Sequence, residues 1–353
     1  MEADGETCGS TSGERWTREE EEALLHLLPT DGRDKDVMDR VRWAIHFSLA
    51  VNVVLFFVKL AVAVLSRSLA IVASLVDSFV DLCSQMVIAI AENRMRTLDP
   101  RFPIGKARLE TVGIIVCASI MSMSALEVIQ QSVIQIVDGV HGNLPKLNLD
   151  IVTYAVLGVA IGLKLALYFY CSALKAYSPS AMALAEDHRN DVLSNLVAII
   201  TASVAHYDPQ RLWYIDPVGA LAISLFIVTS WFCIAKEQID HIVGKGAEPE
   251  FIEQVTSMAN SHHEFLFMDV IRAYHFGDRF LVEIEVVLPR EMTVEESHDI
   301  ALSLQHKVEA MEEVERAFVH VDYQQRIEPE HKVERTLLRH TSSARSSEQE
   351  GKI

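Results

Sequence analysis

The chain has 353 residues, and 49 Asp and Glu outnumber 31 Lys and Arg, which gives a formal net charge of −18. Half of its residues are nevertheless hydrophobic, so apolar and charged residues must be segregated along the chain. Long apolar stretches fill the middle, and acidic or mixed segments hold both ends. The acidic balance excludes a nucleic-acid-binding protein. Five cysteines without C-x-x-C spacing exclude a disulfide framework or a zinc ribbon. The composition predicts a polytopic membrane protein.

Six apolar segments have the length of about 20 residues that a helix needs to cross the bilayer core. The first two are separated only by Ser66-Arg67-Ser68 and are predicted to form a tight helical hairpin. Residues 1–40 form an acidic N-terminal tail, expected to be largely disordered, and residues 41–236 form the transmembrane domain. The predicted spans are Trp43–Leu65, Leu69–Ala91, Thr111–Val133, Ile151–Leu174, Ser180–Val204 and Ile215–Ala235.

Basic residues in short loops predict the orientation of these spans, because cytosolic loops carry an excess of Lys and Arg. The segment before the first span and the loop between the second and third are rich in basic residues. The loops on the other face are poorer, and six spans return the chain to the same side. Both termini are therefore predicted to be cytosolic. The two basic groups are Arg33, Lys35, Arg40 and Arg42, and Arg94, Arg96, Arg101, Lys106 and Arg108.

After Lys236 the composition becomes that of a soluble α+β domain, predicted to occupy residues 243–328. Its order is αββαβ, which suggests a small ferredoxin-like fold. Gly277-Asp278 turns a hairpin, and Thr293 with Glu296 has the spacing of a helix capping box. Residues 329–353 are predicted to be a disordered tail. The expected elements are helix Pro249–Ser261, strands Met268–Phe276 and Arg279–Leu288, helix Thr293–Met311 and strand Arg316–Tyr323.

Two predicted spans carry aspartates at bilayer depth, where ionisable groups are costly and usually functional. The second span contains Asp77 and Asp81, and the fifth contains Asp187 and Asp191. A spacing of four places each pair on one face of its helix. Each stripe continues one turn further with an amide, Gln85 and Asn195. Two such stripes in one bundle favour a site for a divalent cation over pairing of the aspartates with Arg189, His188 or Lys164, the structural alternative.

The ligand types bear on which metal this site prefers. Zinc usually takes at least one imidazole or thiolate, whereas oxygen ligands suit Mg²⁺, Ca²⁺ or Mn²⁺. His188 follows Asp187 directly and should point about 100° away from it, so we expect His188 to lie outside the ligand set. A site built of oxygen ligands therefore binds zinc with less preference over other divalent metals, but it does not exclude zinc.

The same carboxylates suggest how transport is energised. Four crowded aspartates repel one another and cannot all stay ionised in an empty site. Metal entry would expel protons, and protons from an acidic lumen would expel metal, which is an antiport mechanism. The sequence lacks the G-x-x-x-x-G-K-[ST] loop, so it is not a P-loop pump.

Ordered motifs over Ala44 to Pro329 resemble the cation diffusion facilitator family, and within it the manganese-transporting branch of plant-type metal tolerance proteins. The matching segments are SRSLAIVASLVDSFVDL, FPIGKARLETVGIIVCASIMS, DHRNDVLSN, DPVGAL, IRAYHFGDRFLVEIEVVLP and SHDIALSLQHKVEAMEEVERAFVHVDY. Zinc branches carry H-x-x-x-D where Asp187 stands, and often where Asp77 stands. Gln85 in place of Gly, and Arg189-Asn190 in place of an aromatic pair, depart from the manganese pattern.

The resemblance implies a homodimer, joined through the C-terminal domain, that exports divalent metal from the cytosol in exchange for protons. It carries metal binding onto Asp77, Asp81, Asp187 and Asp191. Asn52 in the first span occupies the place of an Asn expected near the site, and a hydrogen bond between helices is the alternative. No tightly bound cofactor is expected: Mn²⁺ is the transported substrate, with Zn²⁺ or Fe²⁺ as alternatives, and protons are the counter-ion.

The C-terminal domain offers a candidate regulatory metal site, since zinc-type relatives bind zinc through histidines and an H-x-D on the last strand. His320 and Asp322 keep that spacing on one face of a strand. Solvated or paired side chains are the alternative. The full candidate set is His275, His298, His320 and Asp322.

The sequence therefore predicts a secondary active transporter rather than an enzyme, with divalent metal ions and the lipid bilayer as partners. An intramembrane aspartyl protease also places two aspartates in membrane helices, but it needs a G-x-G-D sequence that is absent here. A zinc or iron exporter of the same fold is the alternative within transport. An endomembrane such as a Golgi-type compartment or vacuole is expected rather than the plasma membrane.

Overall fold

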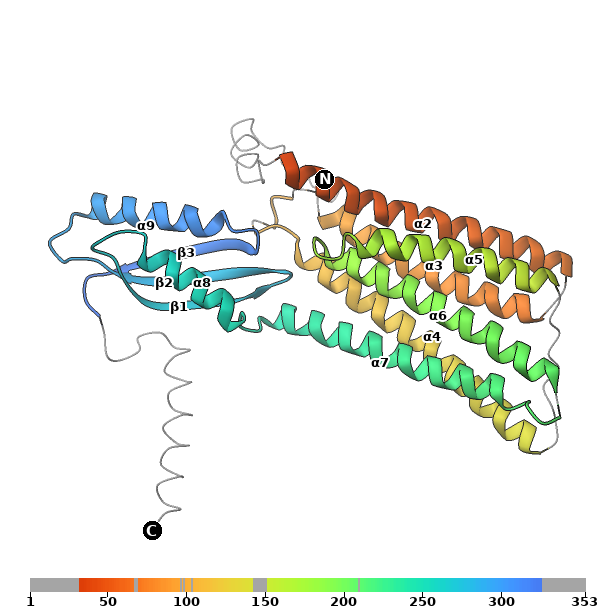
Figure 1. Ribbon diagram of the computed structural model, residues 1–353. Helices are drawn as coiled ribbons and strands as arrows, with labels where there is room; N and C mark the ends of the chain where they lie inside the picture. Colours follow the sequence, from red (N-terminus) through yellow and green to blue (C-terminus); the bar gives the residue numbers. More distant parts are fainter. Residues whose placement is uncertain are drawn as a thin grey trace, which may run out of the picture. The chain divides into compact units, whose positions relative to one another are not determined.

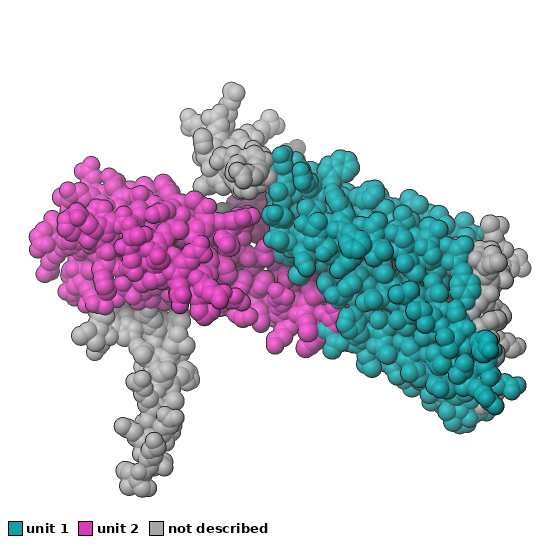
Figure 2. Space-filling view, viewed as in Figure 1, with its two compact units in different colours: residues 1–92, 120–229 teal, residues 93–119, 230–353 magenta. Residues whose placement is uncertain are grey.

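The computed structural model describes residues 32–325 except 67–68, 96, 98, 103, 142–150 and 209. The tails predicted at residues 1–40 and 329–353 lie outside the described residues, apart from 32–40, which are helical. The chain divides into two compact units, one of residues 1–92 and 120–229, the other of residues 93–119 and 230–353 (Figure 2).

Each of the six predicted spans coincides with a long helix among the described residues. Helix α2 begins at Gly32, before the predicted boundary at residue 41, and α7 continues past residue 236 to Val243. Both helices run past the apolar stretch because polar residues at a helix end cost little outside the bilayer core. The helices are α2 (Gly32–Ser66), α3 (Leu69–Met95), α4 (Arg108–Val140), α5 (Ile151–Ser172), α6 (Pro179–Tyr207) and α7 (Ile215–Val243).

Three of these helices are long and apolar enough, within the described residues, to cross a membrane by composition alone: Asp36–Val64 of α2, α4 and α7. Helix α6 contains charged residues, including Asp187 and Asp191, which lower its mean hydropathy. Its start is well defined, because Ser178 caps it through a bond from the Ala181 amide (3.4 Å) and Pro179 follows at the first turn. Helix α5 packs against α6, and α2 packs against both (Figure 1).

The predicted αββαβ order of the C-terminal region is confirmed. The three strands form a mixed sheet in the order β1-β2-β3, with β1 antiparallel and β3 parallel to β2. Gly277 turns the β1–β2 hairpin with a positive φ of 76°. The elements are α8 (Pro249–Asn260), β1 (Phe267–Phe276), β2 (Arg279–Val287), α9 (Val294–Glu309) and β3 (Val314–Asp322).

Alternation along the central strand builds the core of this region. Val282, Ile284 and Val286 of β2 are fully buried, while the residues between them are not. Helices α8 and α9 contribute further apolar side chains to the same cluster, including Val255 and Leu304. Thr293 forms the predicted capping box, since its hydroxyl accepts from the Glu296 amide (3.2 Å) and its own amide donates to the Glu296 carboxylate (3.0 Å).

Candidate metal site

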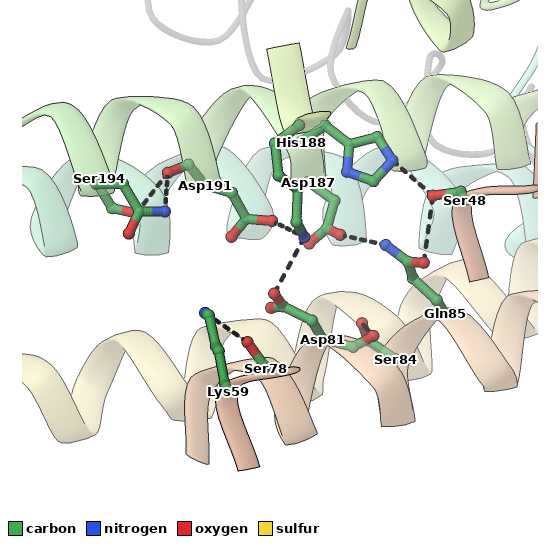
Figure 3. A network of polar contacts seen from close by, with 12 residues as sticks. Ser48, Lys59, Ser78, Asp81, Ser84, Gln85, Asp187, His188, Asp191 and Ser194 are labelled. Atoms are coloured by element: carbon green, nitrogen blue, oxygen red, sulfur yellow. Dashed lines mark hydrogen bonds and ion pairs between the residues drawn. The ribbon is translucent and has the colours of Figure 1, made fainter. Parts of the chain in front are cut away.

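Three of the four predicted aspartates meet between α3 and α6. The carboxylates of Asp81, Asp187 and Asp191 turn toward one another from the two helices (Figure 3). Asp187 is 1% exposed and Asp81 is 8% exposed. One aspartate of α3 and two of α6 therefore supply hard oxygen ligands to one buried space.

Asp77 differs from these three aspartates in its exposure. It sits one turn before Asp81 on α3, and its side chain is exposed. A spacing of four puts both residues on one side of a helix, but it does not decide how deeply each is covered by the neighbouring helices. Its assignment as a metal ligand remains a prediction from the sequence.

His188 is placed differently from the expectation of the sequence. One ligand atom each of Asp187, His188 and Asp191 lies within 4.8 Å of the other two, the only such group of three among the described residues. The 100° step along a helix fixes the direction of Cα–Cβ, whereas the ring nitrogens lie several bonds further out. This group therefore brings one imidazole nitrogen within reach of two carboxylates.

A chain of hydrogen bonds orients this imidazole. The Ser48 hydroxyl of α2 donates to Gln85 Oε1 (3.2 Å), and Gln85 Nε2 donates to Asp187 Oδ2 (3.0 Å). His188 Nε2 lies 2.6 Å from the Ser48 oxygen. Because the serine proton is already used toward Gln85, the ring donates from Nε2, and Nδ1 keeps its free lone pair. The network thus assigns the tautomer that leaves a nitrogen ligand open.

Several atoms at this place are buried without a hydrogen-bond partner in the described structure. They include Asp187 Oδ1, His188 Nδ1 and Asn52 Nδ2. Buried polar atoms are usually paired, so two unpaired lone-pair donors on adjacent residues indicate a position for a ligand. Asp187 Oδ1 and His188 Nδ1 have the chemistry to bind a divalent cation.

The candidate amide ligands take different roles. Gln85 is 1% exposed and holds Asp187 through the bond described above, so it orients a ligand. Asn52 of α2 is 2% exposed, and its amide nitrogen has no hydrogen-bond partner in the part of the chain that the structure describes. Asn195 donates to the backbone carbonyl of Asp191 (2.7 Å), which ties its amide to its own helix.

Lys164 of α5 completes the site, although no transport role was predicted for it from the sequence. Its ammonium donates to Asp81 Oδ2 (3.1 Å) and to Asp191 Oδ2. Lys164 is 4% exposed, which makes this a buried ion pair. Pairing of the aspartates with Lys164, the structural alternative to metal binding, therefore does occur for Asp81 and Asp191. Lys59, the other lysine within the spans, donates to Ser78 of the neighbouring helix α3 (2.6 Å).

The four candidate regulatory residues do not come together within the chain. His275 of β1 pairs with Phe280 of β2, and His320 of β3 pairs with Glu285. The two pairs lie five positions apart along β2, about 17 Å.

The other two candidates make local contacts of their own. His298 lies on the exposed surface of α9 beside Asp299 (3.2 Å), and Asp322 accepts from the Tyr323 amide (2.7 Å). His275 instead stacks on His241 of α7, with ring centroids 3.9 Å apart. A shared regulatory site stays a prediction.

Comparison with known proteins decides what kind of protein holds these residues. Residues 45–243 match a family model described as the cation efflux transmembrane domain, and residues 247–324 match the cytoplasmic domain of cation efflux proteins. The chain belongs to the cation efflux family. Members are transporters and not enzymes, which excludes the intramembrane protease.

Similar curated proteins extend over most of the chain. It is 36% identical to metal tolerance protein 10 of Arabidopsis thaliana over 312 residues, which cover 86% of this chain and 70% of the relative. Metal tolerance protein 11 of the same plant is 36% identical over 325 residues, 90% of this chain and 80% of the relative. Metal tolerance protein 5 of rice is 38% identical over 291 residues, 82% and 69% of the two chains. This cation efflux protein is therefore a divalent-metal efflux transporter embedded in a membrane.

Proposed function

We propose that this transporter moves Mn²⁺ out of the cytosol in exchange for protons. The observation that carries the proposal is the buried group of Asp81, Asp187 and Asp191 with one imidazole, His188, beside them. Mn²⁺ accepts carboxylates together with an imidazole, and carboxylates reduce the advantage of softer metals. A single imidazole leaves Zn²⁺ or Fe²⁺ transport by the same fold as the second candidate.

Charge balance supports proton coupling. Three carboxylates in one buried space require compensating positive charge in every state of the cycle, because isolated charges at this depth are costly. A departing divalent ion removes two charges, and protons from an acidic compartment replace them without a further binding site. No resident cofactor is needed, since the metal is the substrate.

The proposed cell biology follows from the sequence and the family. Basic loops favour cytosolic termini, which agrees with the description of the C-terminal match as a cytoplasmic domain. We place the protein in an endomembrane such as a Golgi-type compartment or vacuole. We also propose that it works as a homodimer joined through the C-terminal domain.

Proton flux in proteoliposomes tests the proposal. The full-length protein is reconstituted around a pH-sensitive dye, and Mn²⁺, Zn²⁺, Fe²⁺ and Ca²⁺ are compared under one proton gradient. We expect proton movement driven by Mn²⁺, little with Zn²⁺, and none in the Asp187→Ala variant. Strong flux with Zn²⁺ alone would overturn the manganese assignment, and metal uptake without proton movement would overturn the antiport.

A further inference from the structure

The ammonium of Lys164 bonds to two of the candidate metal ligands. It bonds to Asp81 Oδ2 (3.1 Å) and to Asp191 Oδ2, and both carboxylates belong to the candidate donor set. A divalent ion bound to these oxygens would lie against a buried positive charge. The metal and the ammonium therefore compete for the same two oxygens.

The rest of the donor set remains open while Lys164 is in place. Asp187 Oδ1 and His188 Nδ1 are buried without a hydrogen-bond partner among the described residues, so neither atom is bonded to the lysine. Asp187 Oδ2 is held by Gln85 at 3.0 Å. An incoming ion can thus be captured first by Asp187 and His188. Asp191 lies within 4.8 Å of both ligand atoms and can join them next.

From this arrangement we propose that Lys164 is a tethered counter-ion that the transported metal displaces. In the empty transporter the single positive charge of the ammonium offsets part of the negative charge of Asp81 and Asp191 and holds α5 to α3 and α6. Metal captured at Asp187 and His188 then takes over the two carboxylates, and the flexible lysine side chain withdraws. When the metal leaves, the return of Lys164 closes the site against rebinding and so aids release.

Helix packing couples such a displacement to the metal site. Lys164 projects from α5, which packs against α6 and α2, so its displacement is felt by helices that carry metal ligands. Four rotatable carbons let a lysine move its charge without moving its backbone. Metal that must first displace Lys164 binds with a lower apparent affinity. The affinity is reduced by the fraction of molecules in which the lysine has already left the two carboxylates.

The proposal rests on the metal site described above but not on the identity of the metal or on proton coupling. Its test therefore measures binding rather than transport. Full-length protein in detergent is titrated with Mn²⁺, and with Zn²⁺ in parallel, by calorimetry, and its thermal unfolding is followed with and without metal. Lys164→Met removes the charge at similar length. Lys164→Arg keeps the charge, and Lys175→Met removes an exposed lysine from the same unit as the matched control.

We expect Lys164→Met to bind metal about 10- to 100-fold more tightly than the wild type. The metal-free variant should unfold at a lower temperature, because two buried carboxylates lose their counter-charge. Metal should raise its unfolding temperature by more than it raises that of the wild type. Lys164→Arg and Lys175→Met should show no tightening. In proteoliposomes, Lys164→Met should lower KM and maximal flux together, since tight binding slows release.

The outcomes separate this proposal from the function itself. Unchanged or weaker metal binding by Lys164→Met, with binding lost in Asp187→Ala, would overturn the displaced counter-ion and leave the site standing. If Lys164 had only a structural role, Lys164→Met would lower the unfolding temperature by the same amount with and without metal. That result would also overturn the proposal. Absence of metal binding by the wild type would instead remove the proposed function.

Discussion

Ser48 offers the sharpest test of how the metal site is organised, because it makes no contact with the metal in our proposal. Its oxygen accepts from His188 Nε2 at 2.6 Å, and its hydroxyl donates to Gln85 at 3.2 Å. Ser48→Ala removes both bonds at once. The imidazole loses the partner that fixes its tautomer, and the amide that holds Asp187 loses its anchor.

The size of the effect follows from these two bonds. Ser48 and His188 are fully buried, and Gln85 is 1% exposed, so water does not readily replace the lost partner. An unsatisfied buried group costs about 1–3 kcal/mol in soluble proteins, and hydrogen bonds in membrane proteins average about 0.6 kcal/mol. For the loss of two bonds we expect Ser48→Ala to lower the free energy of unfolding by about 1–3 kcal/mol. Loss of such supporting bonds typically weakens metal binding about 10- to 100-fold.

Calorimetric titration with Mn²⁺ measures the affinity, and flux in proteoliposomes measures transport. Ser132→Ala is the control, because Ser132 is a 3% exposed serine that donates to a carbonyl of its own helix α4, Val128 O (2.8 Å). Ser132→Ala should keep the affinity of the wild type. If Ser48→Ala binds Mn²⁺ as tightly as Ser132→Ala, the imidazole is not held by this network and His188 is not a ligand.

Three further predictions address selectivity, pH and local stability. Asp187→His should raise Zn²⁺ flux relative to Mn²⁺ by about tenfold, because a second imidazole favours zinc; unchanged selectivity would contradict the argument from ligand type. Burial and the adjacent His241 lower the pKa of His275 to about 4, so neutral His275 contributes stability above its unfolded pKa of about 6.5 that is lost as pH falls toward 4. Thermal unfolding of His275→Gln should therefore depend less on pH over this range, and identical slopes would refute the claim. Thr293→Ala removes the side-chain half of a capping box and should destabilise the start of α9 by about 1 kcal/mol, seen as faster amide exchange there and not in α8.

Local patterns in the sequence were enough to predict the helices and strands and the aspartates of the site. Apolar stretches of bilayer length became α2–α7, and the alternation of Val282, Ile284 and Val286 became the central strand. The capping box formed at Thr293 as its spacing predicted. These features depend on residues a few positions apart, and helix and strand periodicity relate such residues directly. The i, i+4 stripe of Asp187 and Asp191 was legible for the same reason.

Tertiary packing decided which side chains share the buried space. Ser48 reaches His188 across 140 positions of sequence and Gln85 across 37, and Lys164 reaches Asp81 across 83. No local period relates residues so far apart, because their contact depends on how helices rotate and slide against one another. That same rotation buries Asp81 while leaving Asp77, one turn away, exposed. The sequence by itself determined that a membrane bundle carries buried carboxylates, and the packing of α2, α3, α5 and α6 determined that an imidazole and a lysine join them.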